Sequence, residues 1–269
     1  MDKIFIKSEH EVELMYRANQ VVARIFEACE NFIRPGISTK DIDDLVFKII
    51  AEHGAKPNFL NYGTPPFPGS ACVSVNDEVV HGIPRKDRII QSGDIVSVDV
   101  GCELDLYMAD ACRTFCVGEV DARVRELVRV TEESFWLGLE QAVLGKRIGD
   151  ISHAVQVHCE KHGFGIVREM SGHRLGRNLH EGPELLNYGN PGRGLRLEAG
   201  MTLCLEPMVT LGDYRIGIES DEWTIVTLDG SPAAHYENCF VVTPAGPKVL
   251  SLTKAEALAH PEYAYQSKE

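Results

Sequence analysis

Apolar residues recur at helical spacing through the first fifth of the chain. Ser8 is a candidate helix cap, and Glu11 completes a capping box three residues later. One face of the helix that follows is apolar at Leu14, Val21, Val22, Ile25 and Phe26. The Arg-Pro-Gly-Ile segment at 34–37 breaks this pattern. A second helix, capped by Ser38 or Thr39 and ending at Gly54, is apolar at Ile42, Leu45, Val46, Ile49 and Ile50.

The remaining pattern alternates between extended and helical segments. A loop rich in Gly, Pro and aromatic residues covers 61–70, and strands are expected at 71–75, 94–100, 103–108 and 112–117. Two amphipathic helices are expected from Asp121 to about residue 144 and over 151–162. Later extended segments are expected at 165–170, 201–210, 215–219, 222–227 and 234–243. This order predicts an α+β fold, with residues 1–269 forming one domain.

Composition narrows the classes of function. The chain has 269 residues, 44% of them hydrophobic, and a formal net charge of −13. An acidic surface repels phosphate backbones, so we do not expect a nucleic-acid substrate. No run approaches the roughly 20 apolar residues that span a bilayer, and residues 1–10 lack the apolar core of a secretion signal. We therefore expect a cytoplasmic protein without a membrane partner.

The eight cysteines form no Cys-x-x-Cys pair, and most lie in apolar segments. A chain of this size without a secretion signal is not a small disulfide-stabilised domain, so we interpret them as reduced thiols of the core. Cys112 and Cys116 could contact a metal, although two isolated thiols are not typical of a zinc site.

The informative residues are acids within apolar strands. Asp99 lies in the segment 94–101, Glu206 ends the apolar run 201–206, and Glu237 precedes Asn-Cys-Phe-Val-Val. A buried carboxylate without a partner is costly, so each acid requires a cation, hydrogen-bond donors or solvent. Taken singly, each could meet an Arg or Lys, and strand alternation leaves a solvent-facing position open for Asp99.

Three histidines in glycine-flanked loops change this balance. His173 and His180 belong to the glycine-punctuated segment 171–183, and His81 is followed by Gly82. Glycine allows the backbone to approach a bound group closely. Several carboxylates with one imidazole suit Mn, Fe(II), Co or Zn in a two-metal arrangement. The spacing therefore predicts a metallohydrolase.

Five segments together resemble the methionine aminopeptidases, specifically the bacterial type I form, within the larger pita-bread metallopeptidase family. They are Cys-Val-Ser-Val-Asn-Asp-Glu-Val-Val-His-Gly-Ile-Pro, Gly-Asp-Ile-Val-Ser-Val-Asp-Val, Gly-His-x-Leu-Gly-Arg-x-x-His-Glu, Met-Thr-Leu-Cys-Leu-Glu-Pro-Met and Tyr-Glu-Asn. The resemblance runs from Ile6 to about Leu250. It implies the pita-bread fold, with pseudo-symmetric halves of antiparallel sheet backed by helices.

The resemblance also implies a metal centre of two divalent cations per chain (Fe, Mn, Co or Zn). The counterparts of the family's ligands are Asp99, Asp110, His173, Glu206 and Glu237. Asp110 and Glu237 would bridge the cations, and Asp99 would chelate one of them. His173 and Glu206 would bind the other cation.

The implied reaction is hydrolysis of the N-terminal methionine from peptides and nascent proteins by a metal-activated hydroxide. Glu206 would accept and return the proton, and His180 would stabilise the oxyanion. His81 matches a histidine that contacts the scissile peptide. The partners would be peptide or nascent-protein N-termini, with the ribosome as one setting, and the protein would be a monomer.

An apolar pocket for the methionine side chain is the last implied feature. The candidates by position are Tyr62, Phe67, Cys72, Leu179 and Trp223, each of which could equally be a core residue. The chain departs from the family pattern at three places. Arg174 and Ala109 stand where glycine is usual, and Leu179 stands where an aromatic residue is usual. Arg174 could line the rim of the site and favour an acidic or otherwise non-standard second residue, or it could point to solvent.

Several alternatives remain open. A pita-bread aminopeptidase with altered preference for the first or second residue would carry the same ligands. A non-catalytic binding protein on this scaffold usually lacks one or more of them. The prolidase branch usually has a large N-terminal domain, whereas this sequence begins at the helices of the catalytic domain. Type II methionine aminopeptidases carry a helical insertion, for which the stretch between Glu206 and Glu237 is too short.

Overall fold

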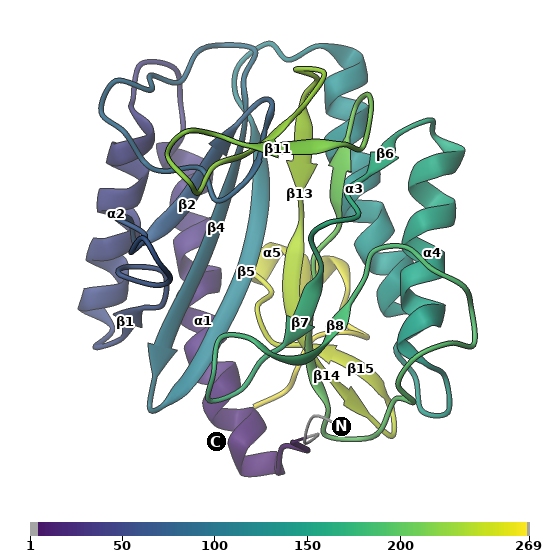
Figure 1. Ribbon diagram of the computed structural model, residues 1–269. Coiled ribbons are helices and arrows are strands. Elements are labelled where there is room, and N and C mark those ends of the chain that lie inside the picture. The colour runs from purple at the N-terminus through teal and green to yellow at the C-terminus, as the bar shows by residue number, and fades with distance from the viewer. Residues whose placement is uncertain (1–4, 268–269) are drawn as a thin grey trace.

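The computed structural model describes residues 5–267, in which helices lie behind an extensively curled sheet (Figure 1). The helices are α1 (Glu9–Phe32), α2 (Thr39–Glu52), α3 (Ala122–Leu139), α4 (Ile148–Lys161) and α5 (Lys254–Ala259). The predicted capping box is present, because the Glu11 N–H donates to Ser8 Oγ and the Ser8 N–H donates to the Glu11 carboxylate. The described residues include no helix long and apolar enough to cross a bilayer.

The largest sheet has nine strands, with the order β1-β4-β5-β14-β9-β7-β8 and with β2 and β15 pairing with β4 and β14. Its strands are β1 (Lys56–Pro57), β2 (Ala71–Val75), β4 (Ile95–Leu104), β5 (Tyr107–Cys116), β7 (Gly172–Arg174), β8 (Glu181–Leu185), β9 (Thr202–Leu205), β14 (Glu237–Thr243) and β15 (Gly246–Val249). A three-stranded sheet contains β13 (Ala233–His235), β10 (Met208–Thr210) and β6 (Gly165–Ile166), in that order. A second three-stranded sheet contains β11 (Ile216–Ile218), β12 (Ile225–Thr227) and β3 (Glu78–Val80). All these pairs are antiparallel, which confirms the predicted α+β class.

Two helix pairs cover the two halves of the sheet. Helices α1 and α2 pack against β2, β4 and β5 through a core that includes Ile25, Ile42 and Val98. Helices α3 and α4 pack against β9, β10 and β14 through a second core that includes Phe135, Val155 and Leu205. This arrangement corresponds to the expected halves of antiparallel sheet, each backed by helices (Figure 1).

The structure corrects several predicted boundaries. The segments predicted at 94–100, 103–108 and 112–117 are two longer strands, because Asp105 and Leu106 form a tight turn with φ of 52° and 68°. The extended run 201–210 is divided between β9 and β10 at Pro207, which has no N–H to donate. Helix α3 ends at Leu139 rather than near 144, and α4 begins at Ile148 rather than 151.

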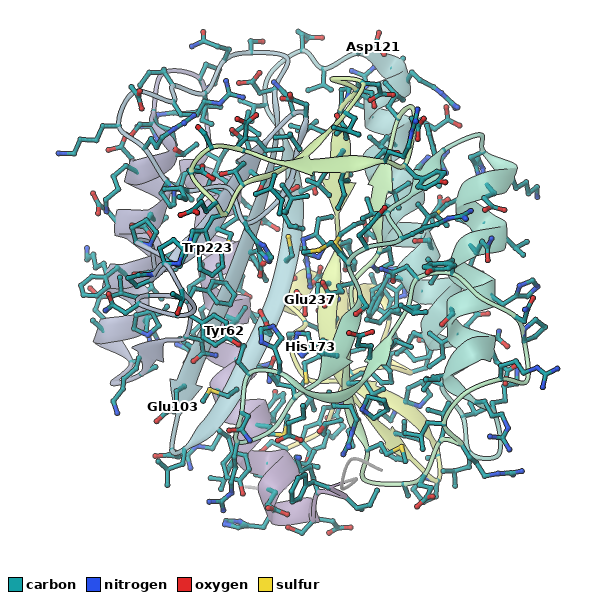
Figure 2. All side chains as sticks on the ribbon, in the orientation of Figure 1. Tyr62, Glu103, Asp121, His173, Trp223 and Glu237 are labelled. Atoms are coloured by element: carbon teal, nitrogen blue, oxygen red, sulfur yellow. The ribbon has the colours of Figure 1, made fainter. Side chains whose placement is uncertain are left out.

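The segment 171–183 was predicted to be a loop, and this was wrong in part. It contains β7 and the start of β8, because β7 pairs with β9 through Arg174 and Leu203. These pairings are between residues far apart in the chain, so local sequence does not reveal them. His173 consequently lies in a strand within the sheet, near the middle of the molecule (Figure 2).

Candidate active site

Strand register brings three acids to one face of the sheet. Cys112 on β5 lies opposite Asp99 on β4 and opposite Glu237 on β14. Directly paired residues share a face of the sheet, and so do residues two apart on one strand. Asp110, two residues before Cys112 on β5, therefore lies on the same face as Asp99 and Glu237. The opposite face of β4, with Val98, packs against the helices. The face of Asp99 that sequence alternation left open to solvent is therefore the face that lines a pocket.

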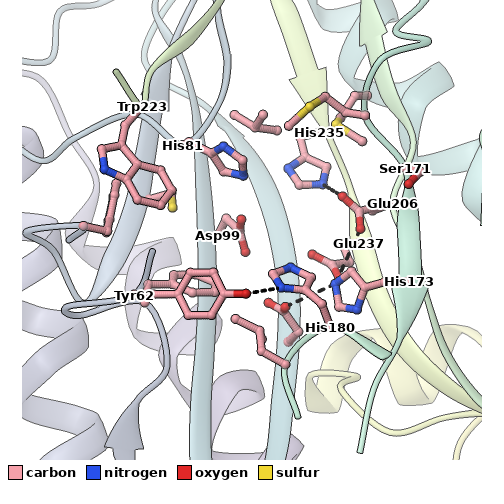
Figure 3. Close-up of a pocket in the computed structure, with 18 residues that line it drawn as sticks. Tyr62, His81, Asp99, Ser171, His173, His180, Glu206, Trp223, His235 and Glu237 are labelled. Atoms are coloured by element: carbon pink, nitrogen blue, oxygen red, sulfur yellow. Dashed lines mark hydrogen bonds and ion pairs between the residues drawn. The ribbon is translucent and has the colours of Figure 1, made fainter. Parts of the chain in front are cut away.

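All twelve residues that the sequence suggested as catalytic, metal-binding or substrate-binding line one cavity of about 170 Å³ (Figure 3). They are Tyr62, Phe67, Cys72, His81, Asp99, Asp110, His173, Leu179, His180, Glu206, Trp223 and Glu237. The cavity has a carboxylate-and-imidazole side and an apolar side.

The acidic residues and His173 converge closely. Carboxylate oxygens of Asp99, Asp110 and Glu237 lie within 4.8 Å of one another. Nε2 of His173 is 3.7 Å from an oxygen of Asp110 and 3.7 Å from an oxygen of Glu206. The five candidate ligands thus face one shared space, although they come from β4, β5, β7, β14 and the end of β9.

No lysine or arginine of residues 5–267 lines this cavity, so the alternative that the acids meet basic partners does not hold for them. Burial raises the pKa of Asp99 to about 7, even though a hydrogen bond with Asp110 lowers it. Burial and the charges of neighbouring carboxylates raise the pKa of Asp110, Glu206 and Glu237 well above the ordinary value. One buried oxygen each of Asp99, Asp110 and Glu237 has no hydrogen-bond partner among the described residues. Oxygens in this state are the donors that a divalent cation requires.

The orientation of the His173 ring also suits binding of a cation. Its Nδ1 lies 3.1 Å from the main-chain oxygen of Arg174, which can only accept, so Nδ1 carries the hydrogen. Burial, together with the neighbouring His180, lowers the pKa of His173 to about 4, which favours the neutral ring. Nε2 therefore presents a lone pair toward the carboxylates, as in metal-binding histidines.

Aromatic residues form the apolar side. The rings of Phe67 and Trp223 meet edge to face with centroids 5.2 Å apart, and the ring of His81 lies 6.0 Å from that of Trp223. Trp223 donates from Nε1 to the main-chain oxygen of Pro65 at 2.9 Å, which joins two loops over the cavity. Tyr62 is 42% exposed, and its hydroxyl lies 2.7 Å from Nδ1 of His180.

Sequence reasoning missed six lining residues: Phe59, Val80, Met170, Ser171, Met208 and His235. His235 is the most informative, because it is 2% exposed and neither ring nitrogen has a hydrogen-bond partner among the described residues. Its Nε2 lies 3.9 Å from an oxygen of Glu206. Burial lowers the pKa of His235 to about 3. Its position two residues before Glu237 was the available signal.

The two expectations for Arg174 were both wrong. Its side chain is 0% exposed and does not line the cavity, because successive residues of β7 point to opposite faces. It donates to the main-chain oxygens of Gly182 (3.1 Å) and Phe5. Ala109 likewise faces the helices, whereas Leu179 lines the cavity. The eight cysteines are all free thiols, and Cys112 and Cys116 do not line the cavity.

A cavity with buried carboxylates, one oriented imidazole and an apolar wall defines the class of metal-dependent hydrolases. Comparison with known proteins identifies the family: the profile of metallopeptidase family M24 matches residues 13–244. The methionine aminopeptidase of Clostridium acetobutylicum is 46% identical over 93% of this chain and 99% of its own. Methionine aminopeptidase 1 of Bacillus subtilis is 42% identical over 92% and 99%. The chain therefore belongs to metallopeptidase family M24 and, within it, to the methionine aminopeptidase group.

Solved structures agree with this family. The methionine aminopeptidase of Thermotoga maritima has a TM-score of 0.91 at 43% identity, covering 93% of this chain and all of its own. The prolidase of Pyrococcus furiosus has a TM-score of 0.75 at 21% identity, covering 93% of this chain and 66% of its own, and shares the fold alone. The pita-bread fold expected from the sequence is thereby confirmed.

Proposed function

We propose that the protein is a methionine aminopeptidase that removes the N-terminal methionine from peptides and nascent proteins, acting through one catalytic domain over residues 1–269. The observation that carries this proposal is the cavity itself. Buried carboxylates lie beside His173 on one side, three of them with an oxygen that has no hydrogen-bond partner among the described residues, and an apolar wall lies on the other. The carboxylate side, with cations bound, would receive the α-amino end of a peptide, and the wall would accept a methionine side chain.

The donor set fits two divalent cations, which we propose to be Fe, Mn, Co or Zn according to availability. Asp99, Asp110, His173, Glu206 and Glu237 would hold them. When bound, the cations would supply Lewis-acid chemistry and make water nucleophilic near neutral pH. Asp110 and Glu237 would contribute to the part of this donor set that both cations share, because each lies beside other candidate ligands.

The chain's own residues perform the remaining steps. Glu206 has a raised pKa and lies beside the cavity, which suits transfer of a proton from water to the leaving amine. His180 stands at the exposed mouth and is proposed to donate to the oxygen of the scissile carbonyl. His81, whose pKa burial lowers to about 4, is proposed to contact the scissile peptide as a neutral ring. Tyr62, Phe67, Cys72, Leu179 and Trp223 would surround the side chain of the first residue.

The test is a peptide panel varied at positions one and two, assayed with Mn(II) and Fe(II) after the metal content has been measured. We expect release of methionine only. His173→Ala removes a candidate ligand and should lower kcat/KM at least 1000-fold, about 4 kcal/mol. His10→Ala, on the exposed surface of α1, is the matched control and should leave the rate unchanged.

Two outcomes would contradict the proposal. Near-full activity of His173→Ala would show that the ligand set is wrong. A wild-type protein that holds no metal and cleaves no peptide would favour a binding protein on this scaffold. The monomeric state, the cytoplasmic location and access to nascent chains at the ribosome stay predictions. Gel filtration measures the oligomeric state, and co-sedimentation measures binding to ribosomes.

A further inference from the structure

The hydroxyl of Tyr62 lies 2.7 Å from Nδ1 of His180, across the mouth of the cavity (Figure 3). We propose that Tyr62 is a positioning residue that fixes the tautomer and orientation of His180. This role differs from that of a pocket wall, which the sequence suggested for Tyr62, and it rests on the proposed function. Tyr62 comes from the loop between β1 and β2, whereas His180 immediately precedes β8. The contact therefore joins the two halves of the molecule.

The direction of this hydrogen bond decides what His180 can do. A phenol is a stronger hydrogen-bond donor than acceptor, so in the proposed arrangement Tyr62 donates and Nδ1 accepts. The hydrogen of the neutral ring is then on Nε2. Among residues 5–267, Nε2 has no hydrogen-bond partner, and it is free to donate to a substrate oxygen. The reverse tautomer would present a lone pair to an oxygen that gains negative charge, which is repulsive.

Tyr62 is held in place by its own loop. The main-chain N–H of Tyr62 donates to the main-chain oxygen of Phe59 at 2.9 Å, and the main-chain oxygen of Tyr62 accepts from the N–H of Phe67 at 2.8 Å. Trp223 packs on this loop at Gly63, where a Cβ atom would lie 2.6 Å from the indole ring. The backbone of Tyr62 is thus anchored on both sides, although its side chain is exposed.

His180 has little else to orient it. It is exposed at the cavity mouth, and its ring lies 4.5 Å from that of His173 in an edge-to-face contact. Such a contact restricts the plane of a ring but does not distinguish its two nitrogens. The Tyr62 hydroxyl is therefore the group that selects between the tautomers.

The experiment is Tyr62→Phe, which removes the hydroxyl and keeps the ring. We expect kcat to fall about tenfold, equivalent to about 1.4 kcal/mol, with KM changed less than twofold because the apolar wall is retained. The matched control is Tyr265→Phe, which removes a hydroxyl that donates to Glu13 away from the cavity, and it should leave kcat unchanged. Tyr62→Leu, which also removes the ring, should raise KM in addition.

A second readout does not depend on turnover. Long-range ¹H–¹⁵N correlation spectra of ¹⁵N-histidine-labelled, metal-free protein assign the hydrogen of each ring. We expect His180 to be the Nε2–H tautomer in the wild type and a mixture of tautomers in Tyr62→Phe. An unchanged tautomer, or a higher KM at unchanged kcat, would overturn the proposal. If the wild type cleaves no methionine peptide while the tautomer shift is present, the proposed function fails and the positioning contact stands.

Discussion

Behind the cavity, a buried ion pair holds the strand that carries Glu237. Arg113 donates from Nε to Oε1 of Glu256 at 2.6 Å and from a terminal nitrogen to Oε2 at 3.0 Å. The same guanidinium donates to the main-chain oxygen of Glu237 at 2.6 Å and to the Asn238 side chain at 2.7 Å. Its carbon lies 4.3 Å from the centre of the Tyr236 ring. Removal of the carboxylate should therefore leave Arg113 as a buried charge without its counterion.

The pKa of Glu256 sets the size of this effect. Burial alone would raise the pKa, but the charge and hydrogen bonds of Arg113 outweigh it and lower the pKa from 4.5 to about 2. The carboxylate side chain is 18% exposed, so solvent screens the pair only partly. At 1.36 kcal/mol per pKa unit, the ionised carboxylate contributes about 3 kcal/mol to the free energy of unfolding at pH 7. Because the folded pKa is depressed, this contribution is lost as pH falls from about 4.5 through about 2.

The perturbation is Glu256→Gln, measured by urea denaturation. We expect a deficit of about 3 kcal/mol at pH 7, or about 6–12 °C in Tm. The deficit should shrink to less than half by pH 3, because the wild-type carboxyl also becomes protonated. Glu126→Gln, which removes a surface partner of Arg123, is the control and should leave the urea denaturation midpoint nearly unchanged. A deficit below 1 kcal/mol at pH 7, or one that does not vary with pH, would refute the reasoning.

Two further predictions concern the site and Arg174. In chelator, the Tm should fall as pH rises from about 5 to about 7, because burial raises the folded-state pKa of Asp99 to about 7 whereas the unfolded carboxyl is already ionised. Saturating Mn(II) should abolish this fall, and a Tm that rises with pH in chelator would contradict the prediction. Arg174→Ala removes the donor to the oxygens of Gly182 and Phe5 and should cost about 1–3 kcal/mol in urea denaturation. Arg174→Ala should not change the ratio of kcat/KM between substrates with acidic and with neutral second residues. A changed ratio would show that Arg174 acts at the rim of the site.

Local sequence determined four of the five helices in the described residues, α5 being missed, and the chemical character of the site. The periodic apolar face and the Ser8–Glu11 capping box are sufficient to locate α1, because a helix brings together residues three and four apart. Acids in apolar strands and histidines beside glycine were recognisable for a similar reason. A charge in an apolar segment is costly wherever it folds, so it indicates a partner before the partner is known.

Only the tertiary structure decided which way these side chains point and what they meet. Alternation divides a strand into two faces but does not say which face lines a cavity, and for Asp99 the pairing of β5 with both β4 and β14 made that choice. Arg174 turned inward because β7 pairs with β9, and Tyr62 reached His180 across a sequence separation that no local pattern spans. These contacts depend on loops closed over long stretches of chain. Their free energy comes from burial and hydrogen bonding between elements, which appear only once the whole sheet has formed.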